Sequence, residues 1–281
     1  MKRTRLPDGT PFRYVNKLEM DFMYKDIFEV GVNSNELIRY ADGDTILDVG
    51  ANIGLFLHFV TKKCRNANLY AFEPIPRIFE VLRANFENTP GYNVRLIRCG
   101  VSRVPGEAVF TYLPLCTARS TMFPEHSPTN NSVEGQKREE EFNLWVFKEL
   151  PNRPLRLALG LLPSFVRRIL ARGLARWHAR AEQVTCEIKS ISQIIEENEL
   201  KQIDLLKIDA ENSEVEILKG IKENHWPCIK QLIVEIHPGP DDPLKQVLEI
   251  LDRHGLKWTV GEDQMQHPAP TVFARRPEVA S

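Results

Sequence analysis

Short apolar runs alternate with amphipathic helical patterns along most of the chain. Five runs have the length and composition of buried strands: 45–49, 68–72, 94–98, 203–209 and 231–236. Five intervening segments space apolar side chains three or four apart, as helices with one buried face do: 54–64, 76–87, 190–197, 213–220 and 243–255. Residues 256–260 and 271–275 add a closing hairpin. The pattern predicts an α/β fold with a mostly parallel, seven-stranded sheet and helices on both faces.

The N-terminal region precedes this alternation and has a pattern of its own. Residues 6–16 read as a turn and a short strand, and residues 18–40 as a helix with a break near Gly31. We therefore expect residues 1–41 to form an N-terminal cap within a single domain of residues 1–281. Further along, residues 106–113 alternate apolar and polar side chains, which predicts one strand of an antiparallel hairpin, and 184–188 predicts another strand.

Residues 117–183 interrupt the α/β pattern and predict an insertion made of a loop and an arginine-rich helical segment. The stretch 117–136 is polar and too long for a bare connection. Residues 153–180 contain seven arginines and no acidic residue. Pro163 and Ser164 are typical of a helix start, so the sequence predicts an amphipathic basic helix beyond them.

Three interpretations of that helix are open. Its arginines recur every four residues as one stripe: Arg168, Arg172, Arg176 and Arg180. Its apolar side chains fill another stripe: Phe165, Val166, Ile169, Leu170, Leu174 and Trp177. The helix could pack on the sheet, dock an acidic partner or a phosphorylated substrate, or bind a membrane surface.

Composition narrows the class of protein. A chain of 281 residues can bury a sizeable core, and a formal charge of −1 argues against a nucleic-acid partner held by general electrostatics. The five cysteines form no C-x-x-C pair, which favours a reducing compartment. Neither a signal peptide nor a membrane span is predicted, so we expect a cytoplasmic location.

The stretch Asp48-Val49-Gly50-Ala51-Asn52-Ile53-Gly54 reads as a strand end, a tight glycine turn and a helix start. Such a turn presents backbone amides to a ligand above the strand end. Asn52 and Leu55 occupy positions where a G-x-G-x-x-G dinucleotide site would have glycine, and no P-loop lysine follows. An acidic residue directly before the turn favours a cationic or amino-bearing ligand over a pyrophosphate.

A second acid, Glu73, ends the next strand in Ala71-Phe72-Glu73-Pro74. Its carboxylate offers only acceptors and suits the two hydroxyls of a ribose. Together these motifs resemble the S-adenosylmethionine-dependent methyltransferases, and more closely the FkbM methyltransferase family. The resemblance extends to Phe28-Glu29, to Cys99-Gly100-Val101-Ser102, and to the stretches 203–211 and 234–238.

The resemblance implies a Rossmann-like class I methyltransferase fold with S-adenosylmethionine as cofactor. It implies that the amino-acid part of the cofactor is held by Asp48, Gly50, Asn52 and Gly54, the ribose by Glu73, and the adenine near Cys99 and Gly100. The sequence departs from the family at one point. Asn212 and Ser213 follow Glu211, where the family commonly has Asp-x-Glu-Gly.

Candidate catalytic residues follow the fourth and fifth strands. Because ligands of open α/β sheets bind beyond the carboxyl ends of the strands, Asp209 and His237 should face the same cleft. We predict His237 as the general base, with Asp209 or Glu211 orienting its ring. Asp209, Glu211 and Glu235 could also supply oxygen ligands to magnesium. However, no Asp-Asn pair follows the fifth strand as in the catechol-type enzymes, and we predict no metal.

The predicted function is O-methylation of a hydroxyl on a natural-product intermediate, either polyketide or peptide. The family resemblance suggests that such an intermediate can be tethered to a carrier protein, which Arg168, Arg172 and Arg176 would dock. Two alternatives remain: a sugar O-methyltransferase, and a docking module of the same fold that has lost turnover. Excision from a larger assembly-line enzyme also remains open.

Overall fold

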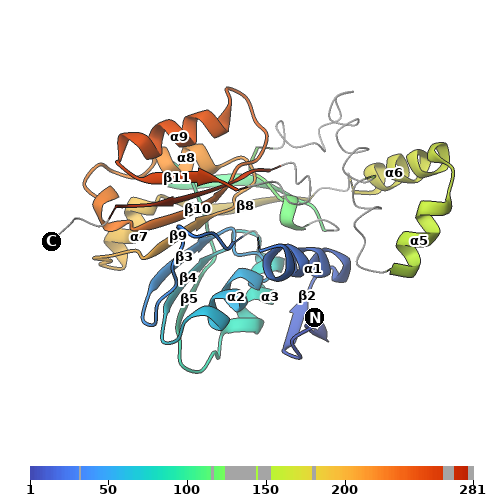
Figure 1. The fold of residues 1–281 in the computed structure, drawn as a ribbon, viewed down its shortest axis with the longest axis horizontal. Helices are drawn as coiled ribbons and strands as arrows, with labels where there is room; N and C mark the ends of the chain where they lie inside the picture. The colour runs from blue at the N-terminus through green and yellow to red at the C-terminus, as the bar shows by residue number, and fades with distance from the viewer. Residues whose placement is uncertain are drawn as a thin grey trace.

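The computed structural model describes residues 1–31, 33–114, 117–123, 144, 153–178, 182–261 and 269–277. A seven-stranded sheet forms its centre, in the order β11-β12-β10-β9-β3-β4-β5 (Figure 1). The bounds of these strands, in chain order, are β3 Thr45–Val49, β4 Asn68–Phe72, β5 Asn93–Ile97, β9 Leu205–Ile208, β10 Gln231–Glu235, β11 Lys257–Val260 and β12 Thr271–Arg275. Neighbouring strands from β5 to β10 are parallel, and β12 is antiparallel to both β10 and β11. The predicted mostly parallel, seven-stranded sheet is confirmed.

Helices cover both faces of the sheet. Successive strand residues point to opposite faces, so these apolar strands have side chains to bury on both. On one face, Ile46 and Leu69 belong to a core cluster with helices α2 (Leu55–Lys63) and α3 (Pro76–Phe86). On the other face, Leu47 and Tyr70 pack with three helices: α7 (Ile191–Glu197), α8 (Glu214–Lys219) and α9 (Pro243–Arg253). Figure 1 shows these two layers on either side of the strands.

The N-terminal segment packs beside α2. A hairpin of β1 (Lys2–Arg5) and β2 (Pro11–Tyr14) precedes α1 (Lys17–Tyr24), which continues as a π-helical turn over Lys25–Val30. The predicted helix through residue 40 is wrong beyond this point. Gly31 adopts a left-handed φ of 80°, and the Asn35 side chain accepts a hydrogen bond from the Leu37 amide at 3.0 Å. Such a side-chain bond favours a turn over a helix.

A second, three-stranded sheet has the order β6-β8-β7 and contains β6 (Gly100–Val101), β7 (Gly106–Tyr112) and β8 (Glu182–Lys189). The predicted antiparallel pairing of 106–113 is confirmed, and its partner β8 follows the insertion in the chain. Within the insertion, α5 (Arg153–Leu161) and α6 (Ser164–His178) stand apart from the seven-stranded sheet (Figure 1). The start of α6 agrees with the predicted start at Pro163-Ser164, whereas α5 was not predicted. The expected loop 117–136 lies mostly outside the described residues.

Candidate active site

A cavity of about 610 Å³, including its open mouth, lies beyond the carboxyl ends of β3, β4 and β9. Strand order reverses between β3 and β9, and ligands of doubly wound sheets bind at such a switch point. Seven of the predicted site residues line the cavity: Gly50, Asn52, Glu73, Cys99, Gly100, Asp209 and Glu211. The other three predicted residues, Asp48, Gly54 and His237, do not line it, although His237 contacts the cavity-lining Glu211.

The turn after β3 is held by close backbone contacts. Gly50 has a φ of 79°, and a Cβ atom built there would lie 1.8 Å from the Asp209 carbonyl oxygen. Any side chain would therefore push the ends of β3 and β9 apart. The amides of Gly50 and Ala51 donate to the Phe72 carbonyl at 3.1 and 3.0 Å, which fixes the turn against β4.

Glu73 bridges the ends of β3 and β4. Its Oε2 accepts a hydrogen bond from the Asn52 amide at 3.1 Å, and its Oε1 accepts one from the Ile75 amide at 2.8 Å. Burial raises the pKa of Glu73 to about 8, against the lowering effect of these two hydrogen bonds. The side chain is thus held rigidly at the cavity wall, with oxygen lone pairs left to accept further bonds.

Asn52 connects the glycine turn to the N-terminal segment. Its Nδ2 donates to Thr117 Oγ1 at 3.3 Å, and that hydroxyl donates to Glu19 Oε2 on α1 at 3.0 Å. The Ala118 amide donates to the other Glu19 oxygen at 2.6 Å. Burial raises the pKa of Glu19 to about 7 despite these bonds. Sequence reasoning missed Glu19, because nothing near it in the chain marks a contact with the insertion.

Asp48 faces a buried lysine that the sequence analysis overlooked. Lys207 Nζ, on β9, lies 3.2 Å from Asp48 Oδ1 and 3.3 Å from Asp209 Oδ2. Burial lowers the pKa of Lys207, but the neighbouring carboxylates outweigh it and raise the pKa above its ordinary value. The ammonium group therefore remains charged. It lowers the pKa of Asp48, although burial of that side chain, which is 2% exposed, outweighs this effect and leaves the pKa raised. A lysine between Leu206 and Ile208, inside an otherwise apolar strand, was the available signal.

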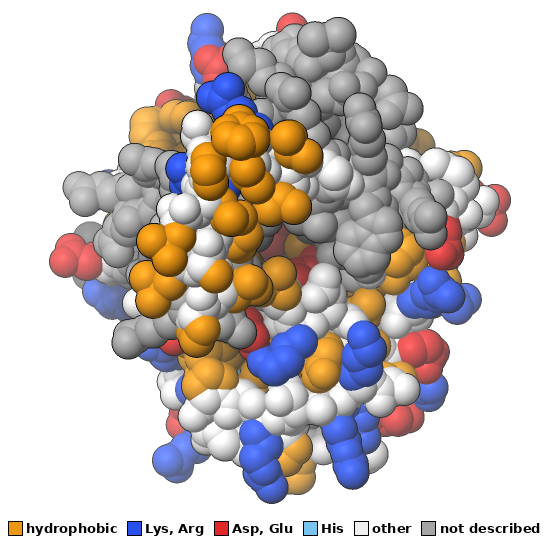
Figure 2. All heavy atoms as spheres, turned by 90° about the vertical axis from the view of Figure 1, so that its right-hand side faces the viewer, with side chains coloured by type: hydrophobic (Ala, Val, Ile, Leu, Met, Phe, Trp, Pro, Cys, Tyr) orange, Lys and Arg blue, Asp and Glu red, His pale blue; other side chains and the backbone are white. Residues whose placement is uncertain are grey.

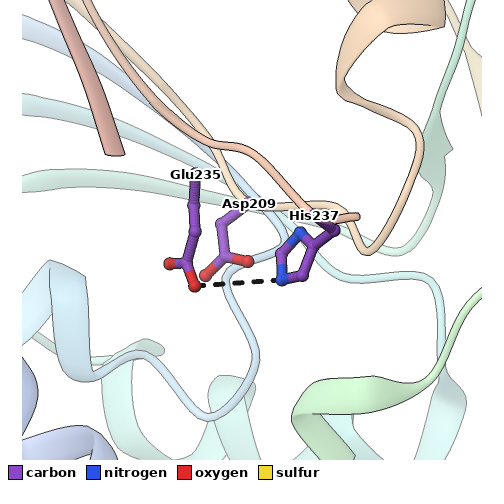
Figure 3. A group of neighbouring side chains, drawn as sticks. All are labelled: Asp209, Glu235 and His237. Carbon is purple, nitrogen blue, oxygen red and sulfur yellow. Dashed lines mark ion pairs between the residues drawn. The ribbon is translucent and has the colours of Figure 1, made fainter. Parts of the chain in front are cut away.

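His237 lies among carboxylates just beyond β10. Its Nδ1 is 2.8 Å from Glu214 Oε1, its Nε2 is 3.4 Å from Glu211 Oε1, and Glu235 Oε1 is 3.8 Å from Nε2 (Figure 3). Burial lowers the pKa of His237, but these carboxylates outweigh burial and hold the pKa well above 6.5. The imidazole therefore carries a proton at neutral pH. Glu214, which the sequence analysis missed, makes the shortest contact with the ring.

The loop between β9 and α8 carries strained backbone. Glu211 and Asn212 have φ values of 42° and 77°, in the left-handed region. The family commonly has glycine at the position of Asn212, and asparagine is one of the few other residues that tolerate this conformation. The departure noted in the sequence thus retains the turn. Thr121 Oγ1 donates to the Glu211 carbonyl at 2.6 Å and ties the loop to the insertion.

Asp209, Glu235 and His237 are also close enough to share a cation. One potential ligand atom from each lies within 4.8 Å of the others (Figure 3). Carboxylate oxygens and an imidazole nitrogen are ligands of several divalent metals. Lys207 already places an ammonium group beside Asp209. That no metal is used stays a prediction.

Comparison with known proteins identifies the family. A family model described as the FkbM methyltransferase domain matches residues 48–257, three quarters of the chain. The chain belongs to the FkbM methyltransferase family. The match begins at the Asp48 turn and includes Glu73, Asp209 and His237.

Individual relatives agree with this assignment. The chain is 29% identical to the 31-O-demethyl-FK506 methyltransferase FkbM of Streptomyces tacrolimicus, over 93% of this chain and 91% of the relative. It is 30% identical to the methyltransferase sdnD of Sordaria araneosa, over 90% of this chain and 88% of the relative. The AMB antimetabolite synthetase AmbE of Pseudomonas aeruginosa is 28% identical over 92% of this chain, which spans 12% of the synthetase.

This FkbM-family protein is a methyltransferase that uses S-adenosylmethionine. The lining of the cavity fits that cofactor. The rigid acceptor Glu73 suits ribose hydroxyls, and the surrounding acids suit a positively charged sulfonium. Among the described helices, none is both long and apolar enough to cross a membrane.

Proposed function

We propose that this FkbM-family protein methylates a hydroxyl oxygen of a small natural-product intermediate. S-adenosylmethionine supplies the electrophilic methyl group. Glu73 accepts the ribose hydroxyls, Cys99 and Gly100 lie along the adenine, and Gly50 and Asn52 surround the amino-acid part. Asp48 and Gly54 support this site without lining it. Asp48 does so through Lys207, and Gly54 leaves room for the Phe86 ring, which a Cβ atom built at Gly54 would meet at 2.4 Å.

The observation that carries the oxygen assignment is the geometry of His237. Glu214 holds Nδ1 at 2.8 Å, so Nε2 is directed toward Glu235 and Glu211, near the cavity-lining Asp209 (Figure 3). An alcohol is a poor nucleophile at neutral pH, and a base that removes its proton accelerates transfer ~10²–10⁴-fold. The name of the Streptomyces relative, which specifies a 31-O position, supports the same choice of acceptor atom.

The raised pKa of His237 determines when it can act. A protonated imidazole cannot accept the hydroxyl proton, so the active form is the fraction that has lost its proton. A sulfonium bound beside the cluster adds positive charge and lowers the pKa of His237, because like charges disfavour each other. Asp209 and Glu211 then stabilise the imidazolium that forms as the hydroxyl proton arrives.

The test uses His237→Gln on a panel of hydroxylated polyketide, peptide and sugar acceptors. We expect turnover to fall ~10²–10⁴-fold while calorimetry shows unchanged affinity for S-adenosylmethionine. His254→Gln is the matched control, since His254 is a largely buried histidine stacked on Trp226 at 4.0 Å, outside the cavity lining. Product NMR identifies the methylated atom. A methyl on nitrogen or carbon, or full turnover by His237→Gln, contradicts the proposal. Cofactor binding without transfer to any acceptor favours a docking module.

Delivery of the acceptor by a carrier protein is a part of the prediction that does not bear on the choice of acceptor atom. Of the three arginines predicted to dock such a carrier, Arg168 is exposed, and the side chains of Arg172 and Arg176 lie outside the described residues. Comparing free and carrier-bound acceptors with Arg168→Glu measures this part separately. Equal losses on both acceptors contradict carrier docking.

A further inference from the structure

Helices α5 and α6 expose an unusual amount of apolar surface. Of the eleven large apolar side chains that are exposed in the described part of the chain, six lie on these two helices: Leu155, Leu157, Leu161, Phe165, Ile169 and Leu170. Leu161 is 87% exposed, Phe165 64% and Ile169 63%. Figure 2 shows hydrophobic side chains gathered over this part of the molecule. Exposed apolar patches of this kind mark interaction sites.

Three large apolar side chains of α6 are exposed: Phe165, Ile169 and Leu170. Ala171 is fully buried, and at 100° per residue it lies on the opposite side of the helix from Ile169. The covered side of α6 thus bears a small residue, and these large ones lie on its exposed side. The interpretation that α6 packs its apolar stripe on the sheet is therefore wrong for Phe165, Ile169 and Leu170.

Helix α5 is exposed on more than one side. Leu155 and Leu157 are two residues apart, about 200° around the helix, yet both are exposed. Leu161 lies about 40° from Leu157. A folded protein partner covers one face of a helix, whereas the acyl region of a lipid layer surrounds an inserted helix. A helix that is apolar on most sides is typical of a buried or membrane environment.

The charge of the segment is entirely positive. Residues 153–180 contain seven arginines and no acidic residue. Arg168 is exposed and lies about 60° from Phe165 around α6, so a cation flanks the apolar stripe. Arginine beside leucine and phenylalanine is the composition of helices that lie in the interface of an anionic membrane.

From these observations we infer that α5 and α6 form a docking surface for an anionic lipid layer, with α5 inserted shallowly and Arg168 at the headgroups. Helix α5 has nine residues, too few to span the ~30 Å core of a bilayer. On the face shown in Figure 2, the hydrophobic patch lies beside a hollow in which acidic side chains are visible. Lipid docking would therefore hold this hollow close to the membrane surface.

The experiment is vesicle flotation of the full chain, and it requires no methyl transfer. Vesicles are phosphatidylcholine alone or phosphatidylcholine with one quarter phosphatidylglycerol. We expect the wild type to float with the anionic vesicles and to float less at high salt or without phosphatidylglycerol. The double variant Leu157→Glu/Ile169→Glu should bind at least tenfold more weakly, because it places carboxylates in the apolar surface. Arg168→Glu should weaken binding to anionic vesicles only.

The matched control is Val104→Glu/Val109→Glu, which changes two exposed apolar residues outside α5 and α6. It should float as the wild type does. No flotation, or equal losses in the control, overturns the inference.

Light scattering and an acyl carrier protein pull-down examine the two rival occupants. Vesicle-independent dimers that the double variant dissociates indicate a second copy of the chain. Carrier capture that needs Arg168, without vesicle binding, indicates an acidic protein. Either result overturns lipid docking.

Discussion

Replacing Lys207 with methionine tests the charge balance beneath the cavity. Methionine fills similar space but leaves Asp48 and Asp209 without the ammonium group that lies 3.2 and 3.3 Å from them. Removing one partner of a buried ion pair costs about 3–5 kcal/mol, because the remaining charge is left buried and unpaired. Asp48 accounts for most of this cost, since its side chain is 2% exposed whereas that of Asp209 is 30% exposed. At about 2–4 °C per kcal/mol, the melting temperature should fall by roughly 6–20 °C.

The pH dependence of the variant has a definite sign. Burial raises the pKa of Asp48 in the folded wild type despite the lowering effect of Lys207, and the loss of Lys207 raises this pKa further. A raised carboxyl pKa favours the folded state at low pH, and this contribution is lost as pH rises through the folded pKa. Lys207→Met should therefore gain stability, relative to wild type, between pH 7 and pH 5. Adding Asp48→Asn removes the unpaired charge and should recover a large part of the loss at pH 7.

Calorimetric melting at both pH values measures these effects. Lys222→Met is the control, because Lys222 forms an exposed ion pair with Glu196 at 2.5 Å, and such pairs contribute about 0–1 kcal/mol. If Lys207→Met melts like this control, or if Asp48→Asn recovers nothing, the assignment of Lys207 as the counter-ion of Asp48 is refuted.

Three further predictions concern the cavity. Glu73→Ala should weaken binding of S-adenosylmethionine at least tenfold in calorimetry. The affinity of the wild type should rise with pH around the Glu73 pKa of about 8, where the carboxylate forms. An affinity that does not change with pH contradicts the role of Glu73 as a ribose acceptor. Glu214→Gln should lower the pKa of His237 and move the acidic limb of the pH–rate profile to lower pH, whereas an unmoved limb means that His237 is not the titrating base. Activity should survive exhaustive chelation; a loss restored by magnesium would mean that Asp209, Glu235 and His237 hold a metal.

The sheet could be read from the sequence because local signals agree there. The apolar runs at Thr45–Val49 and Asn68–Phe72 have the bounds found in the structure, since strand length and the following turn residues are both local. The positions of Glu73, Asp209 and His237 at strand ends follow from the topology rule for parallel sheets.

Contacts between distant segments could not be read in this way. Glu214 reaches His237 only because α8 packs beside the end of β10, and Lys207 meets Asp48 only because β9 lies next to β3. Likewise, the periodicity of α6 reveals an apolar stripe but not its direction. In most surface helices such a stripe faces the core, and here the outward orientation of Phe165 and Ile169 reverses that expectation.

The pairing of β7 has a consequence for how this enzyme can diversify. Thr121 bridges Thr111, and Glu182 pairs with Tyr112, the next residue of the same strand. The chain between Thr121 and Glu182 therefore departs from and returns to neighbouring points on one strand. Exchanging that whole stretch for another, or for a short turn, need not alter the register of either sheet. The free-energy cost of closing a loop rises by only about 0.6 kcal/mol for each doubling of its length. Met122 is the one cavity-lining residue among the described residues of that stretch, so natural variants can exchange the insertion while they keep the rest of the cavity lining.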